Sequence, residues 1–463
     1  MRWAVRMLDE GVRLKELLAK TAVRAARYAS KIRSRRVSPL PQDVASLEAL
    51  GGTLPQGPSD PAEILALLDD IGSPATVATT GGRYFGFVIG GTLPAALAAN
   101  WLAGAWDQNA AMYVMSPVAA KIEEIVLAWL VDLIGLPSTC GAGFVTGTTM
   151  ANFSALAAAR TALLKRAGWN VEEDGLFGAP PIQVVVGAEV HVSVLKALSM
   201  LGLGRSRVIT VPADGQGRMR PDALPPLDDR TVVCIQAGNV NTGAFDPAQE
   251  ICSRARDVGA WVHVDGAFGL WAAVSPLFAH LLEGTGGADS WAIDCHKWLN
   301  VPQDSGIAVV REAEHLRSAM AVSAAYLQPS EAREPCHYTP DSSRRARGVE
   351  LWAAMRSLGR DGLREMIERN CRLAKVFAEG LREAGFQVLN DVVLNQVLVS
   401  FGSPEETRRV IAAIQAEGTC WCGGTQWQGH TAMRISVSNW TTTEEDIALS
   451  LRAMVRIAKD GKT

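Results

Sequence analysis

Between about residues 140 and 310, short runs of β-branched residues alternate with segments of helical periodicity. The runs read GFVTG, IQVVVG, SRVITVP, TVVCIQAG, WVHVDG, SWAID and GIAVVR. Strands that alternate with helices favour a largely parallel sheet covered by helices. The pattern therefore predicts an α/β fold, in which ligands bind beyond the carboxyl ends of the strands.

The flanking segments predict two further parts. The basic N-terminus carries apolar residues at helical spacing, which favours an arm that packs on a surface or on a second subunit. After about residue 345, long helical stretches precede FQVLN, NQVLVSF and AMRISVSN, as in a smaller α+β domain. We expect an arm at 1–80, a large domain at 81–320 and a small C-terminal domain at 321–463.

Composition and charge exclude several classes of protein. The 463 residues carry a formal net charge of -3, so nothing attracts the chain to nucleic acid. Residues 84–106 carry no charge and are long enough to span a membrane. Glycines and Pro94 interrupt this stretch, which favours a buried loop and helix instead. We expect neither a nucleic-acid partner nor a membrane.

The eight cysteines form no CxxC pair, and no histidine stands at zinc-ligand spacing. Cys420 and Cys422 are the one close pair, and ordinary buried thiols are favoured over a redox pair. We expect reduced thiols in a cytoplasmic protein and no metal site.

Two strand ends carry an acid and an amine. Asp265 follows WVHV directly, where it could cap a helix, bind a metal or pair with a buried cation. Lys297 follows SWAID, between His296 and Trp298. An exposed lysine is the alternative, but these neighbours predict partial burial, which lowers an amine pKa and suits a Schiff-base nucleophile.

Two helix starts carry further polar residues. GFVTGTTMANFSALAAAR predicts a strand, a tight turn with Thr148 and Thr149, and an Ala-rich helix whose start could bind a phosphate or be capped by threonine. His191 begins the helix after IQVVVG, where it could cap, pack or stack on a ring. A phosphate cradle, a stacking residue, an acid and an amine are what pyridoxal phosphate needs.

The ordered motifs TGTTxAN, xHxS, HVDGA and DxHKW resemble those of the group II pyridoxal-phosphate decarboxylases, of the aromatic-L-amino-acid decarboxylase type. The resemblance runs from about Tyr84 to the C-terminus and includes RYFGFV and RRARGVELWAAMRSLG. It implies pyridoxal-phosphate fold type I, with a mostly parallel seven-stranded sheet, in a homodimer that acts on a small amino-acid substrate.

The resemblance also implies roles by position. Lys297 would form the Schiff base with pyridoxal 5′-phosphate, and His296 is its usual neighbour. Asp265 would hold the pyridine nitrogen protonated. Ala267 would pack on one ring face and His191 on the other. The phosphate would contact Thr148 and Thr149.

Three positions depart from the family or leave its pattern open. Met150 stands where many members have Glu, and Asp294-Cys295-His296-Lys297 replaces the Asn-Pro-His-Lys of the animal enzymes. A polar residue near the cofactor could be Asn239 or Asn241.

The resemblance implies decarboxylation of an L-amino acid, which an apolar wall at 84–87 and 101–106 predicts to be aromatic. Family members protonate the product with a loop tyrosine. Tyr326 and Tyr338 lie in the right interval, and Tyr338 is the candidate. Arg434, where transaminases of this fold bind a carboxylate, keeps an aminotransferase as an alternative. A carbon-carbon lyase also stays open, whereas a non-catalytic scaffold is disfavoured because every cofactor-contact position is filled.

Overall fold

The computed structural model describes residues 11–321 and 332–460. The predicted α/β fold is confirmed: one sheet has seven strands in the order β1-β7-β6-β5-β4-β2-β3. Its strands are β1 (Gly141–Val145), β2 (Gln183–Gly187), β3 (Ile209–Val211), β4 (Thr231–Gln236), β5 (Trp261–Asp265), β6 (Ser290–Asp294) and β7 (Gly306–Val310). Only β7 runs antiparallel to its neighbours, β1 and β6. All seven lie at the runs that the sequence marked.

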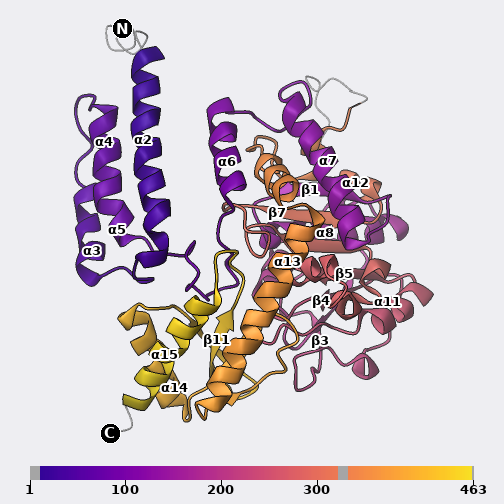
Figure 1. Ribbon diagram of the computed structural model, residues 1–463. Helices are drawn as coiled ribbons and strands as arrows, with labels where there is room; N and C mark the ends of the chain where they lie inside the picture. The colour runs from indigo at the N-terminus through magenta and orange to yellow at the C-terminus, as the bar shows by residue number, and fades with distance from the viewer. Residues whose placement is uncertain (1–10, 322–331, 461–463) are drawn as a thin grey trace.

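Helices cover both faces of this sheet, so its strands are apolar on both sides (Figure 1). One face packs on α8 (Thr148–Arg166), α10 (Val192–Met200) and α12 (Ala313–Met320). The other packs on α7 (Pro117–Ile134), α11 (Ala248–Asp257), the 3-10 helix η5 (Gly269–Val274) and the first half of α13 (Gly348–Glu383). A short helix, α9 (Val171–Asp174), follows α8. All the strands except the antiparallel β7 therefore end at a single edge of the sheet, between two helical layers.

A second, antiparallel sheet has the order β10-β11-β9-β8. Its strands are β8 (Gln387–Val388), β9 (Gln396–Ser400), β10 (Gly423–Trp427) and β11 (His430–Ser436). The second half of α13, α14 (Pro404–Glu417) and α15 (Glu444–Asp460) complete a separate apolar core. Gly359 takes φ 61° inside α13, so the helix kinks where it leaves the large sheet. The sequence predicted this layer except for β10.

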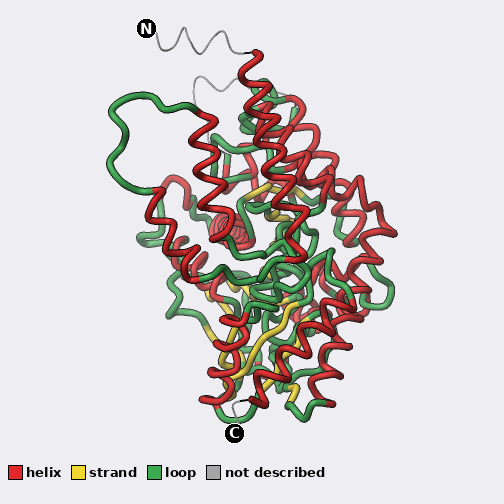
Figure 2. The backbone as a smooth tube through the Cα atoms, turned by 60° about the vertical axis from the view of Figure 1, so that its left-hand side comes forward, coloured by secondary structure: helices red, strands yellow, loops and turns green. Residues whose placement is uncertain are grey.

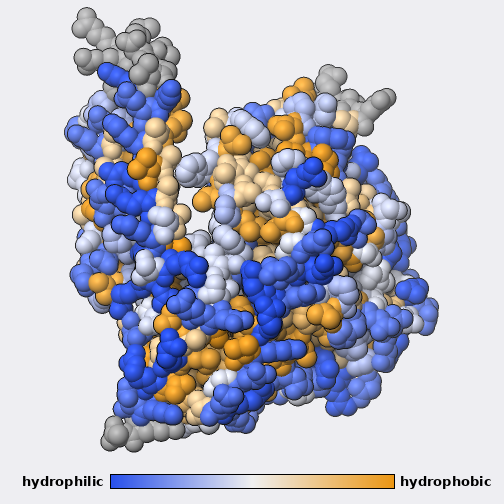
Figure 3. Space-filling model, in the orientation of Figure 1, coloured by the Kyte–Doolittle hydropathy of each residue, from blue (hydrophilic) through white to orange (hydrophobic). Residues whose placement is uncertain are grey.

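The N-terminal helices stand beside the body as a separate column (Figure 1), and in the view of Figure 2 this side of the molecule is turned toward the viewer. They are α2 (Gly11–Lys31), α3 (Pro41–Ala45), α4 (Pro61–Leu67) and α5 (Ser73–Ala75). Arg24 and Arg27 of α2 pair with Asp69 at 2.8 and 2.7 Å, which closes the column. Leu14, Leu18 and Val23 are exposed, and apolar side chains line the side of the column that faces the body in Figure 3.

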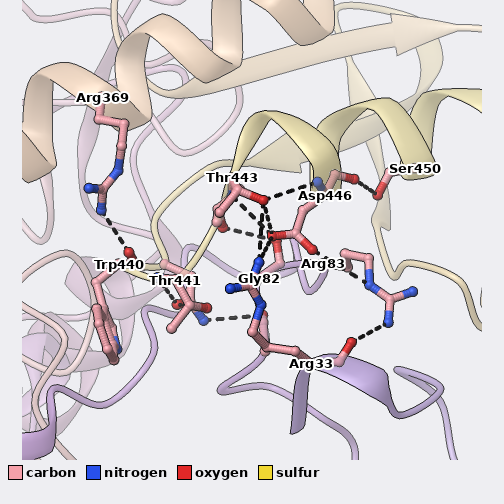
Figure 4. A network of polar contacts seen from close by, with 12 residues as sticks. Arg33, Gly82, Arg83, Arg369, Trp440, Thr441, Thr443, Asp446 and Ser450 are labelled. Carbon is pink, nitrogen blue, oxygen red and sulfur yellow. Dashed lines mark hydrogen bonds and ion pairs between the residues drawn. The ribbon is translucent and has the colours of Figure 1, made fainter.

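A polar network fixes the segment that leads from the arm to the body (Figure 4). The Asp446 carboxylate, at the start of α15, accepts hydrogen bonds from the Thr443 backbone and hydroxyl, at 3.0 and 2.8 Å. It also lies 3.8 Å from Arg83 and 3.6 Å from Arg33. Arg83 donates to the Arg33 carbonyl at 2.9 Å. The start of segment 84–91 is thereby held on the small sheet.

The uncharged stretch 84–106 forms a loop and the helix α6 (Pro94–Trp106), as predicted. The predicted burial does not extend to the helix, in which only Ala96 and Ala99 are buried and Trp101, Leu102 and Trp106 are exposed. Within residues 11–321 and 332–460, no helix is long and apolar enough to cross a membrane.

Candidate active site

Lys297 lies in the turn after β6, at the edge where the strands of the large sheet end. Its Nζ is 3.0 Å from Oδ2 of Asp294, the last residue of β6, and 18% of its side chain is exposed. The partial burial that the sequence predicted is present. The sequence did not predict the second feature, which is that a buried carboxylate, and not an apolar wall, faces the amine.

The turn between β1 and α8 lies against the same carboxylate. The Thr148 N–H donates to Asp294 Oδ1 at 2.6 Å. A side chain at Gly147 would crowd His296 Cε1 at 3.0 Å and Asp294 Oδ1 at 3.2 Å, so glycine is required for this close approach. Thr148 Oγ1 is buried and has no hydrogen-bond partner among the described residues. A helix start with a free hydroxyl fits a phosphate group.

Asp265 ends β5 beside Lys297's strand and is held by Asn152 of α8. The Asn152 Nδ2 donates to Asp265 Oδ2 at 3.2 Å and to Ser193 Oγ at 3.1 Å. The second Asp265 oxygen accepts from the Ala267 N–H at 3.2 Å. Both carboxylate oxygens are thus oriented before any ring nitrogen arrives, which suits a partner for a pyridinium.

The same amide orders His191. Ser193 Oγ lies 2.7 Å from His191 Nδ1, and the Ser193 N–H donates to that nitrogen at 3.3 Å. Since Nδ1 accepts, the proton of the neutral ring is on Nε2. Burial lowers the His191 pKa, and the charges of Lys297 and Arg434 lower it further. The charges of Asp265 and Asp294 raise it, but the net shift is downward. His191 caps α10, so the capping alternative is realised, and its ring is neutral.

A buried histidine that the sequence analysis passed over completes this chain. His263, inside β5, bonds through Nε2 to Asn152 Oδ1 at 2.8 Å and through Nδ1 to Ser290 Oγ at 2.9 Å. Burial lowers the His263 pKa to about 4, so the ring is neutral at physiological pH. With Nε2–H as donor, the amide of Asn152 has one consistent orientation. The signal in the sequence was the Asn of TGTTxAN.

Asn300 joins three segments directly behind Lys297. Its Oδ1 accepts from the N–H groups of Gly91 and Trp440, at 2.5 and 3.0 Å. Its Nδ2 donates to the carbonyls of Trp298 and Ser438, at 2.7 and 3.0 Å. The residue takes φ 57° and is completely buried. The small sheet, segment 84–91 and the lysine turn therefore meet at one side chain.

Segment 84–91 carries two aromatic residues and passes close to the lysine turn at Gly90. Tyr84 stacks on Trp421 with ring centroids 5.1 Å apart, and Phe87 lies 5.3 Å from the same indole. Further along, a Cβ at Gly90 would collide with the Lys297 carbonyl. Burial raises the Tyr84 pKa to about 12. Trp101 and Trp106, expected in the same wall, are 46% and 43% exposed on α6.

Arg434 of β11 reaches the same region. Burial lowers the pKa of its guanidinium, and its charge acts on both Tyr84 and His191. No carboxylate forms an ion pair with Arg434 in the part of the chain that the structure describes. A partly buried cation without an anion is a site for an anionic ligand group.

Tyr338 is not brought to the lysine within this chain. It ends the 3-10 helix η8 (Pro335–Tyr338), its ring lies under the Arg333 guanidinium at 4.4 Å, and it packs on Gly141, the first residue of β1. The phosphate turn follows the opposite end of β1. Tyr326 lies outside the described residues.

The remaining predicted positions have plain environments. Asn239 is buried and accepts through Oδ1 from the N–H of Asn241 at 2.8 Å, while its own Nδ2 has no partner among the described residues. Met150 packs in a small apolar cluster with Val145 and Ala292. His296 Nε2 lies 3.7 Å from Asp294 Oδ1. Cys420 and Cys422 are buried, and all eight cysteines are free thiols.

Comparisons with known proteins identify the family of this chain. Residues 53–402 match the pyridoxal-dependent decarboxylase conserved domain. The chain is 26% identical over 424 residues to an aromatic-L-amino-acid decarboxylase of Bacillus atrophaeus, covering 86% of each chain. It is 31% identical to an acidic amino acid decarboxylase of Mus musculus, covering 68% of this chain and 59% of that protein.

A crystal structure of Oryza sativa TDC with PLP and tryptamine has a TM-score of 0.90 at 23% identity, covering 98% of this chain and 99% of that one, which shows the same fold. With the family domain matched over most of the chain, and with a site that fits the cofactor, the protein is a pyridoxal-phosphate-dependent amino-acid carboxy-lyase and belongs to the pyridoxal-dependent decarboxylase family.

Proposed function

We propose that the enzyme removes the α-carboxylate from an L-amino acid with an aromatic side chain, and releases carbon dioxide and the amine. The observation that carries this proposal is an aromatic cluster: Tyr84 and Phe87, on the segment whose Gly90 packs against the Lys297 backbone, lie against Trp421 of the small domain. Tyr84 stacks on Trp421 at 5.1 Å and Phe87 is tilted against the same indole at 5.3 Å, so the three rings present apolar surface that an indole or phenol ring can extend. The three rings themselves offer an acidic side chain no charged partner.

Each group of the site then has a proposed task. Thr148 and Thr149 would hold the cofactor phosphate, Asp265 the ring nitrogen, and Ala267 and His191 the two ring faces. Lys297 would bind the cofactor aldehyde and release it to the substrate amine, with His296 beside it. The bound cofactor supplies an electron sink for the bond to the carboxylate. Because Asn152 fixes Asp265, the carboxylate needs little reorganisation to meet a charged ring nitrogen.

A proton must replace the lost carboxylate, and Tyr338 stays our predicted donor. Within one chain its ring lies under Arg333, at the far end of β1. The role therefore requires that segment 333–338 serve the site of a second subunit or move. Tyr338→Phe tests the assignment.

Arg434 supports a second candidate. A guanidinium without an ion-pair partner among the described residues would hold a substrate carboxylate, either the acidic side chain of an aspartate-like substrate or the α-carboxylate of a transaminase substrate. A homologous protein is named as a decarboxylase of acidic amino acids, which supports an acidic substrate as the alternative.

The test is a screen of the twenty amino acids with carbon dioxide and amine both measured. Tryptophan, tyrosine or phenylalanine should give the two products in equal amounts. Trp421→Ala should raise KM for that substrate about tenfold or more, since a buried aromatic contact contributes on the order of 1–3 kcal/mol, and Trp421→Phe should restore most of the loss. Turnover of only acidic substrates, or turnover that needs an oxo-acid and releases no carbon dioxide, would contradict the proposal.

We also propose that the working unit is a cytoplasmic homodimer. Leu14, Leu18 and Val23 on the arm, with Trp101 and Trp106 on α6, expose apolar surface that a second copy would cover. Eight free thiols suit a reducing compartment. Deletion of residues 1–50 should convert the dimer into a monomer, as measured by analytical ultracentrifugation. If the deletion variant still sedimented as a dimer, the arm would have no part in assembly.

A further inference from the structure

The phosphate turn of this enzyme already holds an anion of its own. Asp294 is 2% exposed, and its Oδ1 accepts from the Thr148 N–H at 2.6 Å. That N–H is one of the first donors of α8, which have no partner inside the helix and which a phosphate group would use. The carboxylate thus takes a hydrogen bond that the cofactor phosphate needs.

Asp294 bears its charge in this arrangement. Burial alone would raise its pKa, but the charges of Lys297 and His296 and the hydrogen bonds from Thr148 and Lys297 outweigh burial, and the pKa of the carboxyl lies below its ordinary value. The titratable groups that face it are Lys297, His296, Cys295 and His191. The Trp271 indole of η5 donates a hydrogen bond to the Asp294 carbonyl. On β7, the Gly306 backbone pairs with Asp294 in the sheet.

A phosphate monoester brings a charge of about -1.5 to -2 at neutral pH to the same turn. Two anions at one buried N–H repel each other. Among the described residues, the ammonium of Lys297 lies 3.0 Å from Asp294, and His296, which compensates only when protonated, lies 3.7 Å away. When the cofactor aldehyde condenses with Lys297, the free ammonium is no longer available to pair with Asp294. The arrangement is neutral while Asp294 faces Lys297, and gains excess negative charge when the phosphate enters.

We propose that Asp294 is a proton-linked plug of the phosphate turn: it binds the Thr148 N–H while the cofactor is absent, and the turn takes up a proton when a phosphate monoester displaces it. The inference concerns the cofactor, so it stands or falls independently of the aromatic substrate proposed above. An amide at this position, as in the Asn-Pro-His-Lys segment of the animal enzymes, would carry no charge and impose no such coupling.

The test uses 4′-deoxypyridoxine 5′-phosphate, which has the ring and the phosphate but no aldehyde to react with Lys297. Its Kd is measured by calorimetry between pH 5.5 and 8.5 for the wild type and for Asp294→Asn. One additional proton taken up changes affinity by up to tenfold per pH unit. We expect wild-type affinity to fall more steeply with rising pH, so that Asp294→Asn binds about tenfold or more tightly at pH 8 and the gap closes toward pH 5.5.

Calorimetry in two buffers of different ionisation enthalpy counts the protons directly. The wild type should take up more protons per bound phosphate at pH 7 than Asp294→Asn, and 4-deoxypyridoxine, which lacks the phosphate, should show no difference between them. Asp289→Asn is the matched control. It removes a carboxylate just before the opposite end of β6, about 16 Å away at the rise of a strand, and should leave the pH profile unchanged.

Equal pH slopes and equal proton counts in the wild type and Asp294→Asn would overturn the proposal. Should that variant fail to fold, sulfate gives a second test in the wild type, because it stays a dianion over this whole range. Sulfate should inhibit cofactor binding more strongly as pH falls, and inhibition that does not change with pH would also overturn the proposal.

Discussion

Replacing Asn152 by aspartate would test the polar chain that orders both groups around the cofactor ring. Asn152 is completely buried, and its Nδ2 lies 3.2 Å from Asp265 Oδ2. Asn152→Asp keeps the shape of the side chain and the oxygen that faces His263. It changes only the donor that faces Asp265 and Ser193 into an oxygen.

The magnitude follows from that distance. Two charges 3.2 Å apart repel by about 5 kcal/mol at an effective dielectric constant of about 20. This energy corresponds to about 4 pKa units, so the pKa of the introduced carboxyl rises from about 4 in the unfolded chain to about 8 in the folded protein. Because the folded pKa is the higher one, stability is kept at and below pH 4 and is lost as pH rises toward 8, by up to about 5 kcal/mol.

The assay is the denaturation midpoint of the cofactor-free proteins in urea at pH 5, 6, 7 and 8. The gap between wild type and Asn152→Asp should widen steadily with pH. Asn152→Leu loses the same two donated bonds without adding a charge. The difference between its urea midpoint and that of the wild type should therefore not change with pH. If the Asn152→Asp gap were constant too, the amide would not face the Asp265 carboxylate as described.

Three further outcomes follow from the site and its supports. Borohydride reduction of the holoenzyme should attach the cofactor to Lys297 alone, as peptide mass spectrometry would show, and Lys297→Ala should lose the adduct. Asp265→Asn should lower kcat at least a hundredfold while cofactor affinity, followed by absorbance, changes little, since the acid acts on the ring's electronics and not on its anchor. Glu123→Gln should destabilise the fold by about 3–5 kcal/mol in thermal melts, because Glu123 and Arg344 form a pair with 1% of each side chain exposed and Arg333 shares it.

The sequence predicted the large sheet well because its strands, apart from the edge strand β3, are buried along almost their whole length. Each appears as a short β-branched run between turns, and no other element can bury such a run along its whole length. The strand β10 was missed for the opposite reason. Its residues Gly423–Trp427 are half exposed and begin with two glycines, so neither apolar alternation nor β-branched composition marks it.

The candidate site was predictable where a residue follows a strand. Asp265, Lys297 and the Thr148 turn all stand at strand ends, and the topology brings these ends to one edge. Asn152 and His263 were passed over because they lie inside elements, and only the spacing of α8 over β5 brings their side chains together. Asp294 was noticed as a departure, yet its bond to the Thr148 N–H spans 146 residues of sequence.

The groups that suit the cofactor and those proposed to meet the substrate lie in different parts of the chain. The groups that suit the cofactor come from turns after β1, β2, β5 and β6, within one sheet. The groups proposed to meet the substrate, Tyr84, Trp421 and Arg434, come from the linker after the arm and from the small sheet. Asn300 and the Asp446 network fix that second group against the lysine turn. We therefore expect substitutions in the small sheet to change the substrate while the cofactor turns stay as they are; relatives of this chain carry names for aromatic and acidic amino acids alike.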